Sequence, residues 1–95
     1  MLTINQITQA VKTVAEEFSL KRVSLFGSYA EDRSTADSDV DLLVEFFLPA
    51  VSLFTLADIK LRLEELLKVD VDIIHAPLPQ GSLINPEKVV EIYAA

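Results

Sequence analysis

The stretch GSYAEDRSTADSDVD, residues 27–41, decides how this chain is interpreted. It begins with a Gly-Ser pair directly after a short apolar run, and it ends with two aspartates separated by one valine. A glycine after a strand allows the backbone to turn sharply and to approach a ligand closely. The aspartates place negative charge close to that turn. The stretch therefore predicts a strand, a turn and a second strand around a charged site.

The segments on either side predict an α/β (α+β) domain. Thr3 and Gln6 have the spacing of a helix capping box, and apolar residues at helical spacing follow them. Pro86 suits the first turn of a helix, with Val89, Val90 and Tyr93 packing inward. The predicted elements, in order, are helix 3–19, strand 22–26, strand 40–46, helix 53–68, strand 69–74, a loop over 76–86 and a short helix 86–94. This α-β-β-α-β-α order indicates a single domain, residues 1–95, with a mixed sheet of about three strands flanked by helices.

The aspartates predict a metal site. Successive side chains of a strand point to opposite faces, so Asp39 and Asp41 are expected to leave the same face. Two like charges that close together raise one pKa unless a cation lies between them. Mg²⁺ fits, because it takes one or two carboxylates together with substrate phosphates. Asp72 would supply a third carboxylate if its strand neighbours the second one, and two metal ions with three carboxylates suit in-line displacement at phosphorus.

The Gly-Ser turn predicts the other half of such a site. Backbone amides after Gly27, together with the hydroxyl of Ser28, can hold phosphate oxygens. Either feature alone is common in solvated turns and strand ends, so the prediction depends on their combination. Together they indicate that the turn holds a triphosphate and that the aspartates hold the metal bridging to it.

The composition excludes several other kinds of site. The chain has 95 residues with 15 acidic against 8 basic, a net charge of −7, and no basic stripe, which argues against direct binding to nucleic acid. The absence of cysteine excludes disulfides and thiol catalysis. No apolar run approaches the ~18 residues of a membrane span, and the N-terminus lacks the pattern of a signal peptide, so we expect a cytoplasmic protein.

One apolar stretch suggests contact with a partner. The segment FFLPAVSLF, residues 46–54, has no charge, although connections between elements usually lie on the surface and are polar. It is either a buried crossing or a surface that binds a partner protein. The mean hydropathy of +0.35 also favours a chain that is covered by another one in a hetero-oligomer.

Gly27-Ser28, ten residues, and then Asp39-Val40-Asp41 resemble the signature of the nucleotidyltransferase superfamily related to DNA polymerase beta. The likeness is greatest to its minimal nucleotidyltransferase (MNT) domains, and GSYA, SDVDLLVEF, LEELL, VDII and VVEIY follow in the order that this family uses. The resemblance covers nearly the whole chain. It implies the polymerase-beta-like fold, nucleotide binding at Gly27 and Ser28, and two Mg²⁺ ions on the catalytic residues Asp39, Asp41 and Asp72.

The resemblance also implies a biological role. MNT proteins commonly act as antitoxins beside a HEPN-domain ribonuclease toxin. The expected reaction is the transfer of AMP from ATP to a tyrosine of that toxin, which silences it. A tyrosine oxygen would attack the α-phosphorus, and pyrophosphate would leave.

The chain departs from the family pattern directly after the turn. The family usually reads Gly-Ser-x-Ala-Arg-Gly, whereas Glu31 and Asp32 stand here in place of the last two residues. Arg33 follows them and is predicted to contact the nucleotide instead. Two acids near the phosphates favour a second hypothesis, an inactive binding module of the same fold that neutralises its partner by complex formation. A third hypothesis, a small-molecule (antibiotic) nucleotidyltransferase, has little room for an acceptor-binding domain.

Other chemically active residues have simpler interpretations. Asp70 is expected to be a solvated charge at the start of a strand, and His75 a structural residue at its end. Tyr29 and Tyr93 are expected to pack in the core rather than to bind a base or accept a nucleotide.

Overall fold

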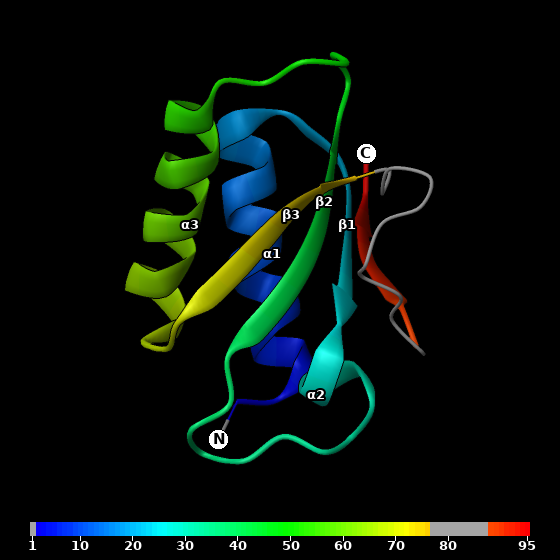
Figure 1. Ribbon diagram of the computed structural model, residues 1–95, viewed down its shortest axis with the longest axis vertical. Helices are drawn as coiled ribbons and strands as arrows, with labels where there is room; N and C mark the ends of the chain where they lie inside the picture. The colour runs from blue at the N-terminus through cyan, green and yellow to red at the C-terminus, as the bar shows by residue number, and fades with distance from the viewer. Residues whose placement is uncertain (1, 77–87) are drawn as a thin grey trace.

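In a computed structural model, which describes residues 2–76 and 88–95, the two long helices lie against one face of a sheet (Figure 1). The elements are α1 (Ile4–Phe18), β1 (Leu20–Phe26), α2 (Gly27–Ala30), β2 (Val40–Phe46), α3 (Leu53–Leu67), β3 (Val71–Ala76) and β4 (Val90–Ala94). Helix α1 begins as the sequence predicts. The Thr3 side chain accepts a hydrogen bond from the Gln6 N–H, and the Gln6 side chain accepts one from the Thr3 N–H.

The order of the strands in the sheet is β3-β2-β1-β4. β1 runs antiparallel to both β2 and β4, whereas β2 and β3 are parallel. A parallel pair needs a crossover connection, and α3 supplies it. This topology brings the end of β1 beside the starts of β2 and β3. In residue terms, Phe26 pairs with Asp41, and Asp41 pairs with Asp72.

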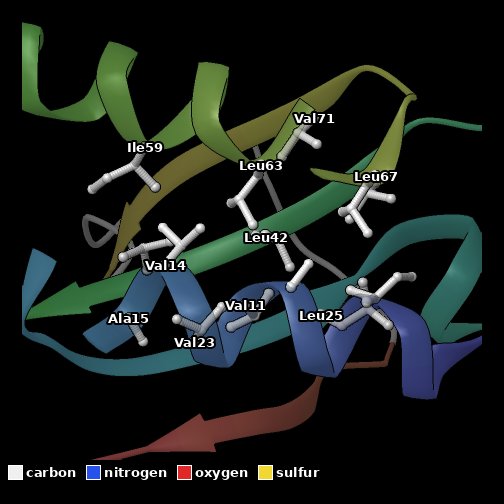
Figure 2. Packing of buried hydrophobic residues seen from close by; sticks show 14 of the residues in the cluster. Val11, Val14, Ala15, Val23, Leu25, Leu42, Ile59, Leu63, Leu67 and Val71 are labelled. Carbon is white, nitrogen blue, oxygen red and sulfur yellow. The ribbon is translucent and has the colours of Figure 1, made fainter. Parts of the chain in front are cut away.

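The core lies between the helices and one face of the sheet (Figure 2). Along β2, Val40, Leu42 and Val44 are buried, while the residues between them point to the other face. Helix α1 contributes Val11 and Val14 to the core, and α3 contributes a row of apolar residues at Ile59, Leu63 and Leu67. The alternation along β2 fixes the register, because a slip of one residue would bury Asp41.

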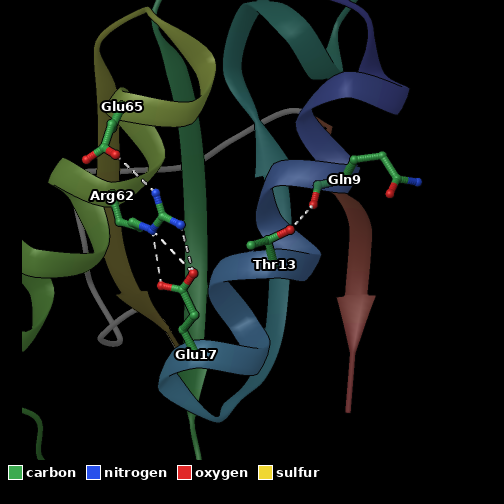
Figure 3. A network of polar contacts seen from close by, with 5 residues as sticks. All are labelled: Gln9, Thr13, Glu17, Arg62 and Glu65. Atoms are coloured by element: carbon green, nitrogen blue, oxygen red, sulfur yellow. Dashed lines mark hydrogen bonds and ion pairs between the residues drawn. The ribbon is translucent and has the colours of Figure 1, made fainter.

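A polar network joins the two long helices at the surface (Figure 3). The Arg62 guanidinium on α3 donates to both carboxylate oxygens of Glu17 on α1, at 3.1–3.3 Å. The third nitrogen of the same guanidinium, Nη1, donates to Glu65 Oε1 at 3.2 Å. The network is partly exposed, so the buried apolar contacts remain the main source of the free energy that holds these helices together.

The predicted helix over 86–94 is wrong, because the described part of that segment contains the strand β4. β4 extends the sheet along the free edge of β1, so the described residues form four strands instead of about three. Its sequence Val-Glu-Ile-Tyr favours a strand by β-branched and aromatic content. An ion pair between Arg22 and Glu91 at 3.0 Å also joins the two strands. Pro86 and most of the predicted loop 76–86 lie outside the described residues.

Smaller differences concern element boundaries. β1 begins at Leu20, two residues before the predicted start, and β3 covers 71–76 rather than 69–74. The Gly-Ser pair begins the short helix α2, where the sequence predicts only a turn. None of the helices in the described part of the chain is long and apolar enough to cross a membrane.

Candidate functional site

Gly27 stands where β1 ends, and two independent constraints require a glycine there. Its φ of +73° lies in the left-handed region, which disfavours every residue with a Cβ atom. A Cβ built on Gly27 would also overlap Oδ2 of Asp41 and approach its Cγ at 3.1 Å. The bare backbone of the turn is therefore packed directly against the first carboxylate of β2.

The loop after Gly27 folds back on the turn. Glu31 N–H donates to the Gly27 carbonyl at 3.0 Å, and Arg33 N–H donates to the Ser28 carbonyl at 2.8 Å. Tyr29 is buried, as expected, and its hydroxyl accepts a hydrogen bond from Leu2 N–H at 3.4 Å. The turn that is predicted to hold phosphates is thus anchored to the core by its own third residue.

Asp41 and Asp72 are brought together by the parallel pairing of β2 and β3. The pKa of Asp41 rises from 3.8 to about 6, chiefly because the carboxyl is partly buried. The charge of Asp72 and a hydrogen bond with it raise this pKa further, and the charge of Asp39 adds a smaller effect. A carboxylate pair of this kind is unfavourable without a cation, and the site therefore favours binding one.

Asp39 lies just before this pair, and its charge is one of the causes that raise the pKa of Asp41. It precedes β2, is exposed, and lines a shallow pocket of about 270 Å³ together with Lys68 and Asp70. In residues 2–76 and 88–95, no three or more histidine or carboxylate side chains converge in a way that could hold a metal ion. The structure thus pairs Asp41 with Asp72 in register, and the charge of Asp39 also acts on Asp41. The assignment of all three to metal binding remains a prediction.

The Asp41–Asp72 pair fits Mg²⁺ in the mode that this ion commonly adopts with nucleotides. Mg²⁺ keeps several waters and binds one or two carboxylates plus substrate phosphates, so it does not require a full set of protein ligands. Two adjacent carboxylates, one of them with a raised pKa, provide that minimum. The bare turn at Gly27 lies against Asp41, where phosphate oxygens would have to approach.

The three charged residues after the turn are arranged in a way that the sequence did not reveal. The Arg33 guanidinium forms an ion pair with Glu31 at 2.9 Å, in which the Glu31 side chain is 17% exposed and that of Arg33 is 66% exposed. Asp32 has a φ of +60°, which explains why a glycine is usual at this position of the family motif. The predicted contact of Arg33 with the nucleotide remains a prediction, and it would have to compete with Glu31.

The apolar stretch after β2 is largely exposed rather than a buried crossing. Phe47, Leu48, Leu53 and Phe54 are 62%, 70%, 81% and 84% exposed. We call these four residues the apolar surface. Beside it, residues of 46–55 and the end of α1 line a pocket of about 390 Å³. His75 packs edge-on against Phe46 with ring centroids 5.2 Å apart, which agrees with a structural role.

The apolar surface and the carboxylate pair lie at opposite ends of β2. Asp41 is the second residue of this strand, and the apolar surface begins directly after its last residue, Phe46. Figure 1 shows the connection from β2 to α3 at the end of the sheet away from α2. At 3.3 Å per residue, the two features are about 20 Å apart along the strand.

Comparison with known proteins gives a consistent result. Residues 7–94 match the family described as nucleotidyltransferase domain. The protein adenylyltransferase MntA of Thermococcus cleftensis is 37% identical over 79 residues, which cover 78% of each chain.

Two solved structures share the fold. A toxin–antitoxin complex with AMP-PNP superposes with a TM-score of 0.78 at 17% identity, over 93% of this chain and 73% of that one. The complex of a tri-AMPylated HEPN toxin with an MNT antitoxin from Shewanella oneidensis gives a TM-score of 0.67 at 16% identity, over 94% and 71%. At these identities the superpositions show the fold alone.

Proposed function

The chain belongs to the nucleotidyltransferase domain family, and on that premise we propose that it transfers AMP from ATP, with Mg²⁺, to a hydroxyl group of a partner protein. The observation that supports this most directly is the Asp41–Asp72 pair beside the bare turn at Gly27. The relative MntA is named a protein adenylyltransferase, which favours a protein as acceptor. We propose a HEPN ribonuclease toxin as partner, a tyrosine as acceptor, and the role of an antitoxin for this chain.

The residues of the site would have separate roles in binding the nucleotide and the metal ion. The amides of the turn and the Ser28 hydroxyl hold phosphate oxygens, while the absence of a side chain at Gly27 lets them come close to Asp41. Asp41 and Asp72 would hold Mg²⁺, and Asp39, whose charge acts on Asp41, would add to the negative charge that attracts the ion. Bound Mg²⁺ supplies positive charge to the phosphates and to the attacking oxygen.

The covalent step is a displacement at the α-phosphorus. The acceptor oxygen forms a bond to that phosphorus, the bond to the β-phosphate oxygen breaks, and pyrophosphate leaves with its electrons. The proton of the hydroxyl passes to solvent or to a carboxylate of the site. The protein contributes by orienting the reactants, since the reaction needs little covalent participation from its side chains.

The exposed apolar surface supports the partner proposal. Four large apolar side chains more than 60% exposed on a chain of this size are typical of a surface that another protein covers. Because this surface is remote from Asp41, the partner would be held at one end of the sheet and modified at the other. We therefore propose a hetero-oligomer of this chain with its substrate protein.

Transfer of label from ATP tests the proposal. The chain is purified from its native lysate with bound proteins and incubated with ATP labelled at the α-phosphate and Mg²⁺. We expect label on a co-purifying protein, no label with Asp41→Asn or Asp72→Asn, and normal labelling with Asp70→Asn. Asp70 is the matched control, because it is an exposed aspartate just before β3.

One observation favours a second function, that of an inactive binding module. Arg33, the first basic residue after the turn, forms an ion pair with Glu31, which weakens the attraction of this loop for a triphosphate. In that case the same purification yields a stable partner that carries no label with any variant.

A further inference from the structure

Two charged residues of α3, Lys60 and Glu64, contact the first residue of β3. β3 is the edge strand of the sheet, next to β2. The outer side of an edge strand presents backbone N–H and C=O groups that no neighbouring strand can satisfy. In this protein, the first of these groups are satisfied by side chains from the crossover helix.

The contacts form a closed ring of three hydrogen bonds. Val71 N–H donates to Glu64 Oε2 at 3.0 Å, and Lys60 Nζ donates to the Val71 carbonyl at 2.7 Å. Lys60 Nζ also donates to Glu64 Oε2 at 3.1 Å, one helical turn along α3. The hydrogen bond from Val71, followed by that from Lys60, lowers the pKa of Glu64, so this carboxylate stays charged at neutral pH.

The ring is adjacent to Asp72. Peptide groups alternate in direction along a strand, and the carbonyl of Asp70 accepts a hydrogen bond from Val40 N–H of β2 at 3.0 Å. Val71 therefore directs its groups to α3, and Asp72 directs its own to β2, where its register partner is Asp41. Near Asp72, β3 is therefore hydrogen-bonded to α3 on its outer side and to β2 on its inner side.

We infer that Lys60 and Glu64 form a clamp that positions Asp72 beside Asp41. An edge strand with an aspartate opposite another aspartate experiences repulsion that pushes it outward, and hydrogen bonds to its outer side oppose this movement. Lys60 and Glu64 are positioning residues, because they act through the backbone of Val71. The inference rests on the proposed function, in which Asp72 holds the metal ion.

The matched control for Glu64 is Glu65, the next residue of α3. Its side chain is 69% exposed and pairs with Arg62 on the same helix, away from Val71. Glu65→Ala removes the same charge from the same turn without affecting the clamp. Glu64→Gln keeps an oxygen that can accept from Val71 N–H, and it serves as the milder variant should Glu64→Ala fail to fold.

The test uses Mn²⁺ as the probe and the full chain labelled with ¹⁵N. Mn²⁺ affinity is measured from the broadening of amide signals around Asp41 and Asp72, and hydrogen exchange of the Val71 amide is measured without metal. We expect Glu64→Ala to weaken Mn²⁺ binding about tenfold, as is common when a supporting hydrogen bond is lost, and to speed exchange at Val71. Glu64→Gln should lie between wild type and Glu64→Ala, and Glu65→Ala should match wild type.

Equal Mn²⁺ affinity of Glu64→Ala and Glu65→Ala, with both folded, would overturn the clamp. A wild-type chain that binds no Mn²⁺ at the carboxylates would contradict the proposed function instead. In that case the hydrogen-exchange rate of the Val71 amide still tests the clamp, because an unchanged rate in Glu64→Ala would mean that the ring of hydrogen bonds does not hold β3. A merely structural role for Glu64 predicts lower stability with unaltered Mn²⁺ affinity.

Discussion

Replacement of Gly27 by alanine should affect the candidate site far more than it affects the fold. The added Cβ meets the Asp41 carboxylate, with Cγ at 3.1 Å and the Asp41 Cβ at 3.3 Å, where ordinary contact begins at 3.4 Å. The backbone cannot relieve the overlap easily, because β1 is paired with β2 up to Phe26 and Asp41. The Asp41 side chain must therefore move away from the turn.

The expected magnitudes differ for stability and activity. A residue other than glycine in the left-handed region costs roughly 1–2 kcal/mol, and the loss of chain freedom in the unfolded state offsets about 0.4–1 kcal/mol of this. The free energy of unfolding should fall by about 1 kcal/mol from the backbone alone, and by more once the overlap is included. Displacement of a carboxylate by about 1 Å can lower the transfer rate on the order of 100-fold.

A double-mutant cycle separates the overlap from the backbone effect. In Asp41→Ala the atoms Oδ2 and Cγ are gone and only the Cβ contact at 3.3 Å remains, so Gly27→Ala in that background should cost little more than the backbone contribution. Stability is measured by urea denaturation and activity by label transfer. Equal costs of Gly27→Ala in both backgrounds would show that the contact with Asp41 is not responsible, and near-normal transfer by the single variant would refute the proposed geometry.

Three other changes have defined outcomes. Without divalent cations, the raised pKa of Asp41 means that the wild-type chain loses stability as pH rises from about 4 to about 6. In urea denaturation, Asp41→Asn should therefore be more stable than wild type by about 1–2 kcal/mol at pH 7.5 and equally stable near pH 4. A difference in stability that is constant with pH would contradict this. Glu31→Gln should release Arg33 from its ion pair and tighten AMP-PNP binding about two- to fivefold, as measured by calorimetry. The same change in an Arg33→Gln background should have a much smaller effect. Equal effects in the two backgrounds would exclude the ion pair as the cause. Phe54→Ser should leave the denaturation midpoint unchanged but reduce co-purification of the partner, whereas Leu61→Ser, at another exposed position of α3, should reduce neither.

The sequence predicts those features whose causes lie within a few residues. The capping box of Thr3 and Gln6 is confirmed, because both partners and the helix they start are contiguous. The strand 40–46 is also confirmed, since its buried side alternates within a single run. The polymerase-beta-like resemblance agrees with the observed fold, because the order of the elements up to β3 is encoded by such local patterns.

The segment that the sequence misassigns depends on a distant partner. Val90 and Tyr93 lie three residues apart, which fits one face of a helix, and a proline upstream favours the same interpretation. The free edge of β1, about 70 residues earlier, decides the outcome by offering antiparallel pairing. Tertiary pairing of this kind overrides local propensity, and a single sequence does not reveal which edge is free.

The candidate site shows the same limit. The adjacency of Asp41 and Asp72 follows once β2 and β3 are parallel neighbours. Strand alternation predicts that Asp39 shares their face, but β2 begins at Val40, so the position of Asp39 depends on the loop before the strand and its role stays a prediction. The ion pair of Arg33 and the contacts of Glu64 with Val71 depend on how loops close, for which the sequence contains no periodic signal.

The distance between the two ends of β2 has a consequence for how a substrate protein would be selected. The proposed site at Asp41 consists of a bare turn and two carboxylates, which would recognise phosphates and a metal ion but offer few groups to recognise an acceptor chain. Selection of the partner would then depend on the apolar surface about 20 Å away, and its contribution would be a raised effective concentration of the acceptor hydroxyl. Damage to the apolar surface should thus raise the KM for the partner while leaving nucleotide affinity unchanged, because the two events use different ends of the sheet. If the same damage also weakened nucleotide binding, the partner would have to complete the nucleotide site. Selection of the partner and the chemical step would then be inseparable.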